Sequence, residues 1–255
     1  MSKKMRILLT NDDGYFSDGI KVLFRELSKS ANVYMVAPDR EQSASSHSLT
    51  LERPLRVQKL GERCYTIDGT PTDCVMLGVH MVLKRRPPHM IISGINHGAN
   101  MGEDVTYSGT VAAAIEGSIL GIPSLAVSMV DWALGTPMTR AARFVCRMVS
   151  RYRQLGLDPA TFLNINLPPD SGRPYRRFRF TSLGVRQYRD YVIHKTDPRG
   201  KAYYWIGGYP TWKATPGSDF EAVDSGSVSI TPLKLDFTDS GSLKRLQHLD
   251  LKVLS

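Results

Sequence analysis

Short apolar runs alternate with segments of helical periodicity from the start of the chain. Residues 7–9 form an apolar run too short for a helix, and such a run is typical of a strand buried on both faces. The next apolar positions recur at helical spacing, and they are Ile20, Leu23, Phe24 and Leu27. Residues 33–37 then form a second apolar run, which Pro38 closes. This order predicts a strand, a helix and a second strand, the unit from which parallel sheets are built.

The same alternation continues to residue 167. Thr70 suits a helix N-cap and Pro71 suits the first helical position. In this helix Val75, Val79 and Val82 are expected to face inward. In the next predicted helix the inward positions are Val111, Ala114, Ile115, Ser118 and Ile119. In a third they are Ala142, Val145, Val149 and Tyr152. Strands are predicted at residues 90–92, 123–129 and 162–167. We therefore predict an α/β fold with a mostly parallel sheet.

The last third of the chain is richer in strand patterns. Residues 178–183 and 228–232 are predicted as strands, and residues 191–209 as a hairpin that turns at Asp-Pro-Arg-Gly. Residues 240–254 are predicted as a helix with one apolar face, made of Leu243, Leu246, Leu249 and Val253. We expect residues 1–185 to form an α/β core and residues 186–255 to form a β-hairpin arm, a returning strand and a terminal helix.

The predicted arm carries a run of apolar residues, which are Tyr203, Tyr204, Trp205 and Ile206. A two-stranded hairpin alone is marginal in water, and exposed aromatic clusters of this size usually mark an interface. We therefore expect a homo-oligomer in which the hairpin and the terminal helix pack against a neighbouring chain.

Composition narrows the class of protein. The chain has 255 residues, 42% of them hydrophobic, which is enough to bury the core of one large domain. No segment has the apolar length of a signal-peptide core or a membrane span, so we expect a cytoplasmic protein without a membrane partner. Cys64, Cys74 and Cys146 lack C-x-x-C spacing, which argues against a disulfide framework and against a zinc site.

The net charge of +9 comes from 33 basic and 24 acidic residues. Such an excess is compatible with a nucleic-acid partner, an acidic membrane surface or anionic small substrates. Much of it lies in residues 140–153 and 173–189, without a helix-turn-helix pattern. We expect a solvated basic face that also attracts phosphate-bearing substrates, and no stable nucleic-acid complex.

Two adjacent carboxylates follow the first predicted strand. Asp12 and Asp13 come directly after Thr10 and Asn11, at the carboxyl end of a central strand, where open α/β sheets bind ligands. Neighbouring carboxylates repel each other unless a cation or a proton lies between them. Oxygen ligands of this kind suit Mg²⁺ or Mn²⁺. The dipeptide alone suits equally well an Asx-turn that caps the next helix.

Two later segments favour a phosphate ligand. A glycine-rich loop at residues 93–104 follows a predicted strand and would let backbone N–H groups approach an anion closely. Ser108, Gly109 and Thr110 then open a helix, where free N–H groups and the helix dipole favour phosphate. A Ser or Thr at this position is also an ordinary helix cap. The coincidence of this terminus with the glycine-rich loop and the Asp pair favours the phosphate site.

Several motifs occur in a fixed order along nearly the whole chain. They are N-D-D-G from Asn11, A-P-D-R from Ala37, G-T-P-x-D-C-V from Gly69, S-G-I-N-x-G-x-N-x-G-x-D from Ser93, Y-S-G-T-V-A-A-A from Tyr107, Y-W-I-G from Tyr204, D-F-x-A-V-D from Asp219 and V-S-I-T-P-L from Val228. Together they resemble the SurE (survival protein E) family of metal-dependent nucleotidases. The resemblance implies a three-layer, doubly wound (Rossmann-like) α/β/α core and a homodimer or homotetramer.

The resemblance also implies a site and a reaction. One divalent ion per subunit, Mg²⁺ or Mn²⁺, would be held by Asp12, Asp13, Ser43 and Asn96. The residues expected to bind phosphate or substrate are Asn96, Gly98, Asn100, Ser108, Gly109 and Thr110. The implied enzyme is a 5′-nucleotidase that hydrolyses nucleoside 5′-monophosphates, with 3′-nucleotides and short polyphosphate as further substrates. The chain departs from its relatives at residues 44–47, where they often carry Gly or Asn, so substrate preference is left more open than metal binding.

For the mechanism we expect a metal-activated water to attack phosphorus. Asp12, Asp13 and Asn11 are the expected catalytic residues, with Asp13 as base and Asn11 orienting Asp12. Direct attack by a carboxylate, which would give an aspartyl-phosphate, is the alternative. His47 and His97 invite a catalytic role because imidazole in general can exchange a proton near neutral pH. A loop histidine is more often a surface or hydrogen-bonding residue, so we expect neither to be catalytic.

Three other kinds of protein share parts of this pattern. A haloacid-dehalogenase-like phosphatase needs carboxylates two positions apart, whereas Asp12 and Asp13 are adjacent. A receiver-type signalling domain needs an Asp after its third strand, where this chain has Ser93 and Gly94. A non-enzymatic nucleotide-binding module would keep the glycine-rich loop without using a metal, and it is the alternative that an assay has to separate from the enzyme.

Overall fold

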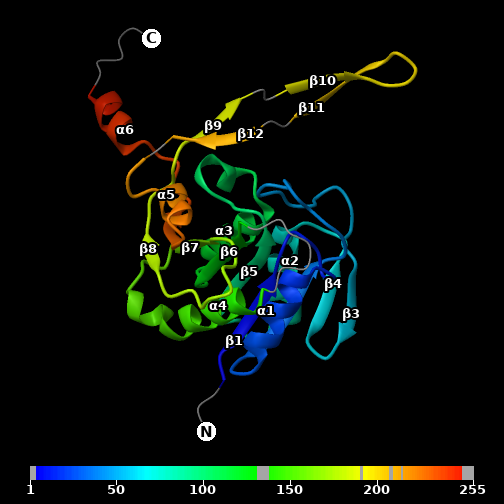
Figure 1. The fold of residues 1–255 in the computed structure, drawn as a ribbon. Helices are drawn as coiled ribbons and strands as arrows, with labels where there is room; N and C mark the ends of the chain where they lie inside the picture. The colour runs from blue at the N-terminus through cyan, green and yellow to red at the C-terminus, as the bar shows by residue number, and fades with distance from the viewer. Residues whose placement is uncertain (1–3, 131–137, 190–191, 207–208, 214, 249–255) are drawn as a thin grey trace.

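The computed structural model describes residues 4–130, 138–189, 192–206, 209–213 and 215–248. Figure 1 shows a central sheet covered by helices on both faces, with a long hairpin and the last helix projecting from one end of the body. No helix among the described residues is both long enough and apolar enough to cross a membrane.

One sheet of nine strands forms the centre, in the order β3-β4-β2-β1-β5-β6-β7-β13-β8. Its parallel core consists of β2 (Asn32–Pro38), β1 (Arg6–Thr10), β5 (Met90–His97), β6 (Ser124–Met129) and β7 (Thr161–Leu167). The strands at the two edges are β3 (Val57–Gly61), β4 (Cys64–Ile67), β13 (Val228–Lys234) and β8 (Phe178–Phe180). β3 and β13 run antiparallel to their inner neighbours, so the sheet is mostly parallel, as predicted.

Helices cover both faces of the sheet and make a three-layer fold (Figure 1). The helices are α1 (Asp18–Ser28), α2 (Pro71–Leu77), α3 (Gly109–Ile119), α4 (Thr139–Arg151), α5 (Asp219–Asp224) and α6 (Ser240–Gln247). α1 and α4 pack with Ile7 and Leu9 in one core cluster, whereas α2 and α3 pack with Leu8 in another. The three apolar residues of β1 thus face both layers, which confirms a strand buried on both sides.

The sheet has its topological switch point at β1, which pairs with β2 on one side and with β5 on the other. In such sheets the crevice at the carboxyl ends of the diverging strands receives the ligand. The turn that carries Asp12 and Asp13 follows β1, and the glycine-rich loop follows β5, so both segments lie at this crevice.

Some predicted details were wrong. Ile119 is 53% exposed because α3 ends there, although its position was expected to face inward. Residues 57–67 form the antiparallel pair β3 and β4, which the pattern did not indicate. The helix that begins at Pro71 continues as a short π-helix, η1 (Gly78–Val82). Leu249 and Val253 of the predicted terminal helix lie outside the described residues.

The predicted hairpin is confirmed as β10 (Val192–Thr196) paired with β11 (Ala202–Ile206). Its turn closes with a hydrogen bond of 3.0 Å from the Gly200 N–H to the Asp197 carbonyl. A second pair, β9 (Arg186–Arg189) and β12 (Tyr209–Trp212), joins this hairpin to the body. The Trp212 ring stacks on Phe220 of α5 with centroids 5.0 Å apart, which anchors the base of the arm.

The returning strand joins the central sheet. β13 pairs with β7 and β8, so residues beyond 186 also complete the core sheet. The division of the chain at residue 185 stays a prediction. Two short 3-10 helices complete the described elements, η2 (Gly102–Thr106) and η3 (Tyr152–Leu155).

Candidate active site

Asn11 holds the turn after β1 in place. Its side-chain Nδ2 donates to the Gly14 carbonyl at 2.9 Å and to the Ser17 hydroxyl at 2.8 Å, which ties the turn to the start of α1. The Asn11 Oδ1 atom is buried and has no hydrogen-bond partner in the described part of the chain. Asn11 therefore fixes the backbone of the turn that carries the Asp pair, and its Oδ1 is a buried acceptor without a partner among the described residues.

Asp12 is buried against the N-terminus of α3. Its Oδ2 accepts a hydrogen bond of 3.0 Å from the Thr110 N–H, and its Oδ1 accepts one from the Thr110 hydroxyl. Burial raises the pKa of Asp12 above its usual value, although both hydrogen bonds from Thr110 oppose the rise. The carboxylate is thus held rigidly where its negative charge is costly without a cation.

Asp13 is less deeply buried and faces the loop after β5. Its Oδ2 accepts a hydrogen bond of 3.3 Å from the His97 N–H. Burial and then the charge of Asp12 raise the pKa of Asp13 to about 7, and Glu41 adds a smaller repulsion. No lysine or arginine among the described residues forms an ion pair with Asp12 or Asp13.

The serine-rich loop at residues 39–48 lies against the Asp turn. The Gln42 N–H donates to the Asp12 carbonyl at 2.7 Å, and a Cβ atom on Gly14 would come within 2.9 Å of the Arg40 carbonyl carbon. Ser43 directly follows Gln42 in this loop and is exposed. Its hydroxyl donates to Glu41 Oε1 at 2.7 Å, so Glu41 is a third carboxylate at this edge.

The glycine-rich loop begins inside β5 and places Asn96 beside His97. Asn96 Nδ2 donates to the Gly98 carbonyl at 2.9 Å, and this leaves its Oδ1 available as a ligand. Asn100 lies further along and is buried, with its Nδ2 donating to the Ser128 hydroxyl at 2.8 Å. Neighbouring strands therefore fix Asn100, and its side chain braces the loop.

The N-terminus of α3 completes the arrangement. The Ser108 hydroxyl accepts from the Val111 N–H at 3.1 Å, so it caps the helix. The N–H of Thr110 is bound to Asp12, whereas those of Ser108 and Gly109 have no partner in the described chain. These two N–H groups are suited to an anion.

Gly109 is required by close packing at this terminus. A Cβ atom there would lie 2.7 Å from the Ser45 hydroxyl and 2.9 Å from the Asp12 Cβ. The Ser45 hydroxyl is itself buried without a hydrogen-bond partner among the described residues. Ser45, Asp12 and the first turn of α3 therefore touch one another.

The residues present fit a hard divalent cation. Two buried carboxylates without a basic partner, a nearby hydroxyl and an amide oxygen are the donors that Mg²⁺ or Mn²⁺ prefers. The described residues contain no cluster of three or more His, Cys, Asp and Glu side chains arranged for a metal. The expected ligand set has only two such residues, and the assignment of Asp12, Asp13, Ser43 and Asn96 as ligands stays a prediction.

Several contacts of this site were not predicted from the sequence. His47 in the serine-rich loop lies 2.9 Å from the carboxylate of Glu116 on α3. Asp219, at the start of α5, accepts from the Gly102 N–H at 2.9 Å and so holds the end of the glycine-rich loop. The only signal for Ser45 was the serine-rich composition of its loop, and no local pattern indicated Glu116 or Glu41.

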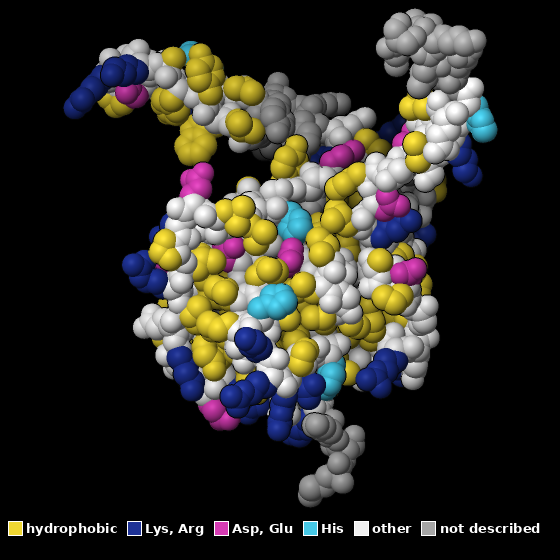
Figure 2. Space-filling model, turned by 180° about the vertical axis from the view of Figure 1, so that it is seen from behind, with side chains coloured by type: hydrophobic (Ala, Val, Ile, Leu, Met, Phe, Trp, Pro, Cys, Tyr) yellow, Lys and Arg dark blue, Asp and Glu magenta, His cyan; other side chains and the backbone are white. Residues whose placement is uncertain are grey.

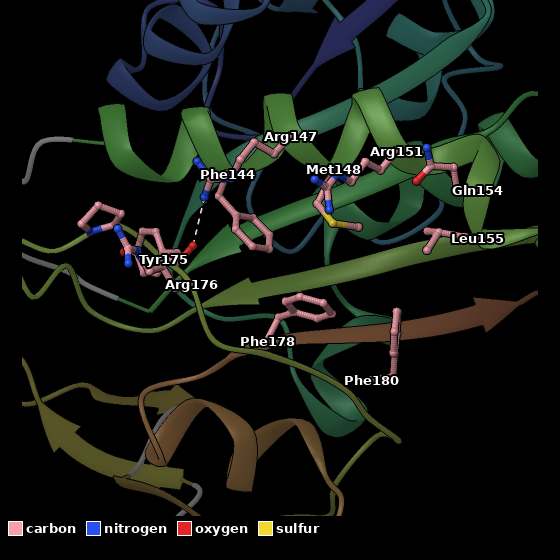
Figure 3. A pocket seen from close by; sticks show the side chains of 11 residues that line it. Phe144, Arg147, Met148, Arg151, Gln154, Leu155, Tyr175, Arg176, Phe178 and Phe180 are labelled. Atoms are coloured by element: carbon pink, nitrogen blue, oxygen red, sulfur yellow. Dashed lines mark hydrogen bonds between the residues drawn. The ribbon is translucent and has the colours of Figure 1, made fainter.

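A separate groove lies between α4 and the edge strand β8, with a volume of about 740 Å³ (Figure 3). Its side chains include Phe144, Met148, Phe178 and Phe180, with Arg147, Arg151 and Arg176 at its rim. None of the predicted site residues lines it. Elsewhere, the view of Figure 2 shows lysine and arginine side chains gathered at the end of the body opposite the arm.

Comparisons with known proteins show which family the chain resembles over nearly its whole length. The family model described as "Survival protein SurE" matches residues 7–190. A protein of Geotalea daltonii named "5′-nucleotidase SurE" is 47% identical over 248 residues, which cover 97% of this chain and 100% of that protein. One of Pelobacter propionicus with the same name is 48% identical over 241 residues, or 94% of this chain and 97% of that protein. The crystal structure of the SurE protein from Aquifex aeolicus matches with a TM-score of 0.83 and 41% identity, covering 95% of this chain and 99% of that one.

Proposed function

The chain belongs to the survival protein SurE family, and from this premise we propose that it hydrolyses nucleoside 5′-monophosphates to nucleoside and phosphate at the Asp12–Asp13 site. One observation carries the location of the site. The buried carboxylate pair has no basic partner in the described chain and touches the N-terminus of α3, where an anion is favoured. A cation bound by the carboxylates would therefore lie next to a phosphate bound at the N-terminus of α3.

A divalent ion would be held by Asp12, Asp13, Ser43 and Asn96. When bound, Mg²⁺ or Mn²⁺ supplies activation of water and neutralises charge on the phosphoryl group. We propose one such ion per subunit. The same ligands offer no preference between the two metals.

The chain's own residues bind and orient the substrate. The free N–H groups of Ser108 and Gly109 would donate to the phosphoryl oxygens, and the dipole of α3 would favour their negative charge. Thr110 holds Asp12 through two hydrogen bonds, and Asn11 holds the turn. Asp13 is the proposed general base that takes the proton of the attacking water. Without a metal, burial and the charge of Asp12 raise the pKa of Asp13 to about 7.

Substrate range follows from which part of the nucleotide the site contacts. We propose that Asn96, Gly98, Asn100 and the start of α3 contact the phosphate part of the substrate rather than the base. We therefore include 3′-nucleotides and short polyphosphate in the proposal as further substrates. The location of the protein in the cell stays the prediction made from its sequence.

The test is phosphate release from AMP by the purified chain with Mg²⁺ or Mn²⁺, and again after EDTA treatment. We expect turnover that EDTA abolishes and that either metal restores. Asp13→Asn should lose most turnover, whereas Asp18→Asn, at the exposed start of α1, should keep it. AMP binding without phosphate release under any metal condition would favour the non-enzymatic nucleotide-binding module instead.

We also propose a homodimer or homotetramer, in which the hairpin and the last helix pack on a neighbouring chain. Figure 2 shows hydrophobic side chains along the arm. Trp205 and Ile206 are 62% and 75% exposed, and Leu246 of α6 is 55% exposed. Surfaces of this kind are characteristic of interfaces. The groove beside β8 is a further apolar surface that a neighbouring chain would cover.

A further inference from the structure

A hydrogen bond between His47 and Glu116 links the serine-rich loop to the helix of the candidate site. His47 Nε2 lies 2.9 Å from Glu116 Oε2, and their side chains are 30% and 9% exposed. Because an ionised carboxylate can only accept, the imidazole Nε2–H is the donor. His47 is the only hydrogen-bond or ion-pair partner of the Glu116 side chain in the described chain. A buried carboxylate needs such a partner, which makes the contact strongly preferred.

The loop that carries His47 has an unusual backbone that other contacts also hold. Ala44 and Ser46 have φ values of 56° and 53°, in the left-handed region that residues with a Cβ seldom adopt. The Ser46 N–H donates to the Tyr107 carbonyl at 3.1 Å, and its hydroxyl donates to the Thr106 carbonyl at 2.8 Å. Such a conformation persists only where surrounding contacts determine it. The loop is therefore shaped by its attachment to the segment that leads into α3.

One helix thereby holds both halves of the site. Thr110, in the first turn of α3, binds the Asp12 carboxylate, and Glu116, about two turns after the start of the helix, binds His47. Ser43 and Ser45 lie between the Asp turn and His47 in the sequence. Ser43 is expected to bind the metal, and the buried hydroxyl of Ser45 lies beside Gly109. α3 contacts the loop through Glu116 and Asp12 through Thr110. Because the helix is rigid, it sets the distance between the loop and Asp12.

We infer that His47 and Glu116 are positioning residues, which hold the serine-rich loop so that Ser43 can reach the metal and Ser45 can face the phosphate. This inference rests on the proposed function of the Asp12–Asp13 site. Neither residue is a catalytic group, and the pair acts through the loop. Removing a residue that orients a ligand typically weakens metal binding about 10–100-fold.

The experiment measures Mn²⁺ binding by calorimetry on metal-free protein and inhibition by inorganic phosphate. We expect His47→Ala and Glu116→Ala each to weaken both by about tenfold or more, with the cooperative thermal transition retained. Glu116→Gln keeps an oxygen that accepts from His47 and should stay within about threefold of wild type, which separates positioning from charge. The double variant should be no worse than either single variant, because both remove the same contact.

His80→Ala is the matched control, since His80 is exposed and lies outside the loop. His47→Gln, whose amide can still donate to Glu116, should stay within about threefold of wild type, and if His47→Ala does not fold, Glu116→Ala carries the test. Wild-type protein that binds no Mn²⁺ would overturn the proposed metal site itself. Wild-type binding with unchanged Mn²⁺ and phosphate affinity in His47→Ala or Glu116→Ala would overturn the positioning role alone.

Discussion

Thr110 donates two hydrogen bonds to Asp12, one from its backbone N–H to Oδ2 and one from its hydroxyl to Oδ1. The residues are 98 positions apart in the chain and meet because β1 and the N-terminus of α3 lie at the same edge of the sheet. The contact fixes both oxygens of a buried carboxylate. Both donors of Thr110 are thus used by Asp12, and the N–H groups without a partner among the described residues at this terminus are those of Ser108 and Gly109.

Thr110→Val removes the hydroxyl donor with little change in side-chain volume. Asp12 Oδ1 then loses its partner and its orientation, so we expect Mn²⁺ affinity and turnover to fall about tenfold. Thr110→Ser keeps the hydroxyl and should stay within about threefold of wild type. Calorimetry and AMP hydrolysis measure the two effects, and Thr211→Val is the control, because Thr211 in β12 is exposed. Equal metal affinity in Thr110→Val and wild type would show that this hydroxyl does not position Asp12.

The parallel core could be predicted because each of its strands contains consecutive apolar residues. Ile7, Leu8 and Leu9 are consecutive and all fully buried, which a strand covered on both faces allows. The edge pair β3 and β4 could not be predicted in the same way, because Gln58, Lys59 and Leu60 are exposed and follow no clear alternation. An edge strand takes its pairing from the neighbouring strand rather than from its own pattern.

The candidate site could be predicted only where its residues are neighbours in the chain. The Asp pair and the Ser108–Thr110 terminus are each local patterns at a strand or helix end. The contacts between segments, Thr110 with Asp12 and His47 with Glu116, span 98 and 69 positions and arise from the order of the strands. Nothing in the local sequence indicates which loop residue will meet which helix residue.

Asp13 makes the stability of the metal-free protein depend on pH. Its pKa in the folded protein is raised to about 7 from the usual 3.8, so the folded state holds this proton more tightly than the unfolded chain. The stabilisation is complete below pH 3.8 and is lost as pH rises to about 7. We expect the free energy of unfolding of wild type, relative to Asp13→Asn, to fall across this window by up to about 1.4 kcal/mol per pH unit. Urea unfolding in EDTA at several pH values measures it, and parallel curves for the two proteins would contradict the prediction.

Gly109→Ala places a Cβ atom 2.7 Å from the Ser45 hydroxyl and 2.9 Å from the Asp12 Cβ. The new methyl group must displace both, so inhibition by inorganic phosphate and Mn²⁺ affinity should both weaken. Overpacking of this kind also costs about 1–3 kcal/mol of stability. Gly61→Ala is the control, because its Cβ would meet Cys64 at an ordinary 3.5 Å. Phosphate inhibition that survives Gly109→Ala unchanged would place the phosphate site elsewhere.

The apolar surfaces of the arm and of α6 are exposed in a single chain, so we expect an oligomer. Light scattering at micromolar protein concentration should give a mass above the 28.4 kDa of one chain. Ile206→Ser and Leu246→Ser each remove an apolar side chain that is 75% or 55% exposed, so neither should lower the stability of an isolated chain appreciably. In the proposed assembly both side chains would be buried, so each substitution should shift the mass towards that of the monomer. Leu51→Ser is the control, because Leu51 is 85% exposed and lies outside both elements. A wild-type mass of 28.4 kDa would refute the assembly. If deletion of residues 240–255 leaves the oligomer unchanged, the last helix is not part of its interface.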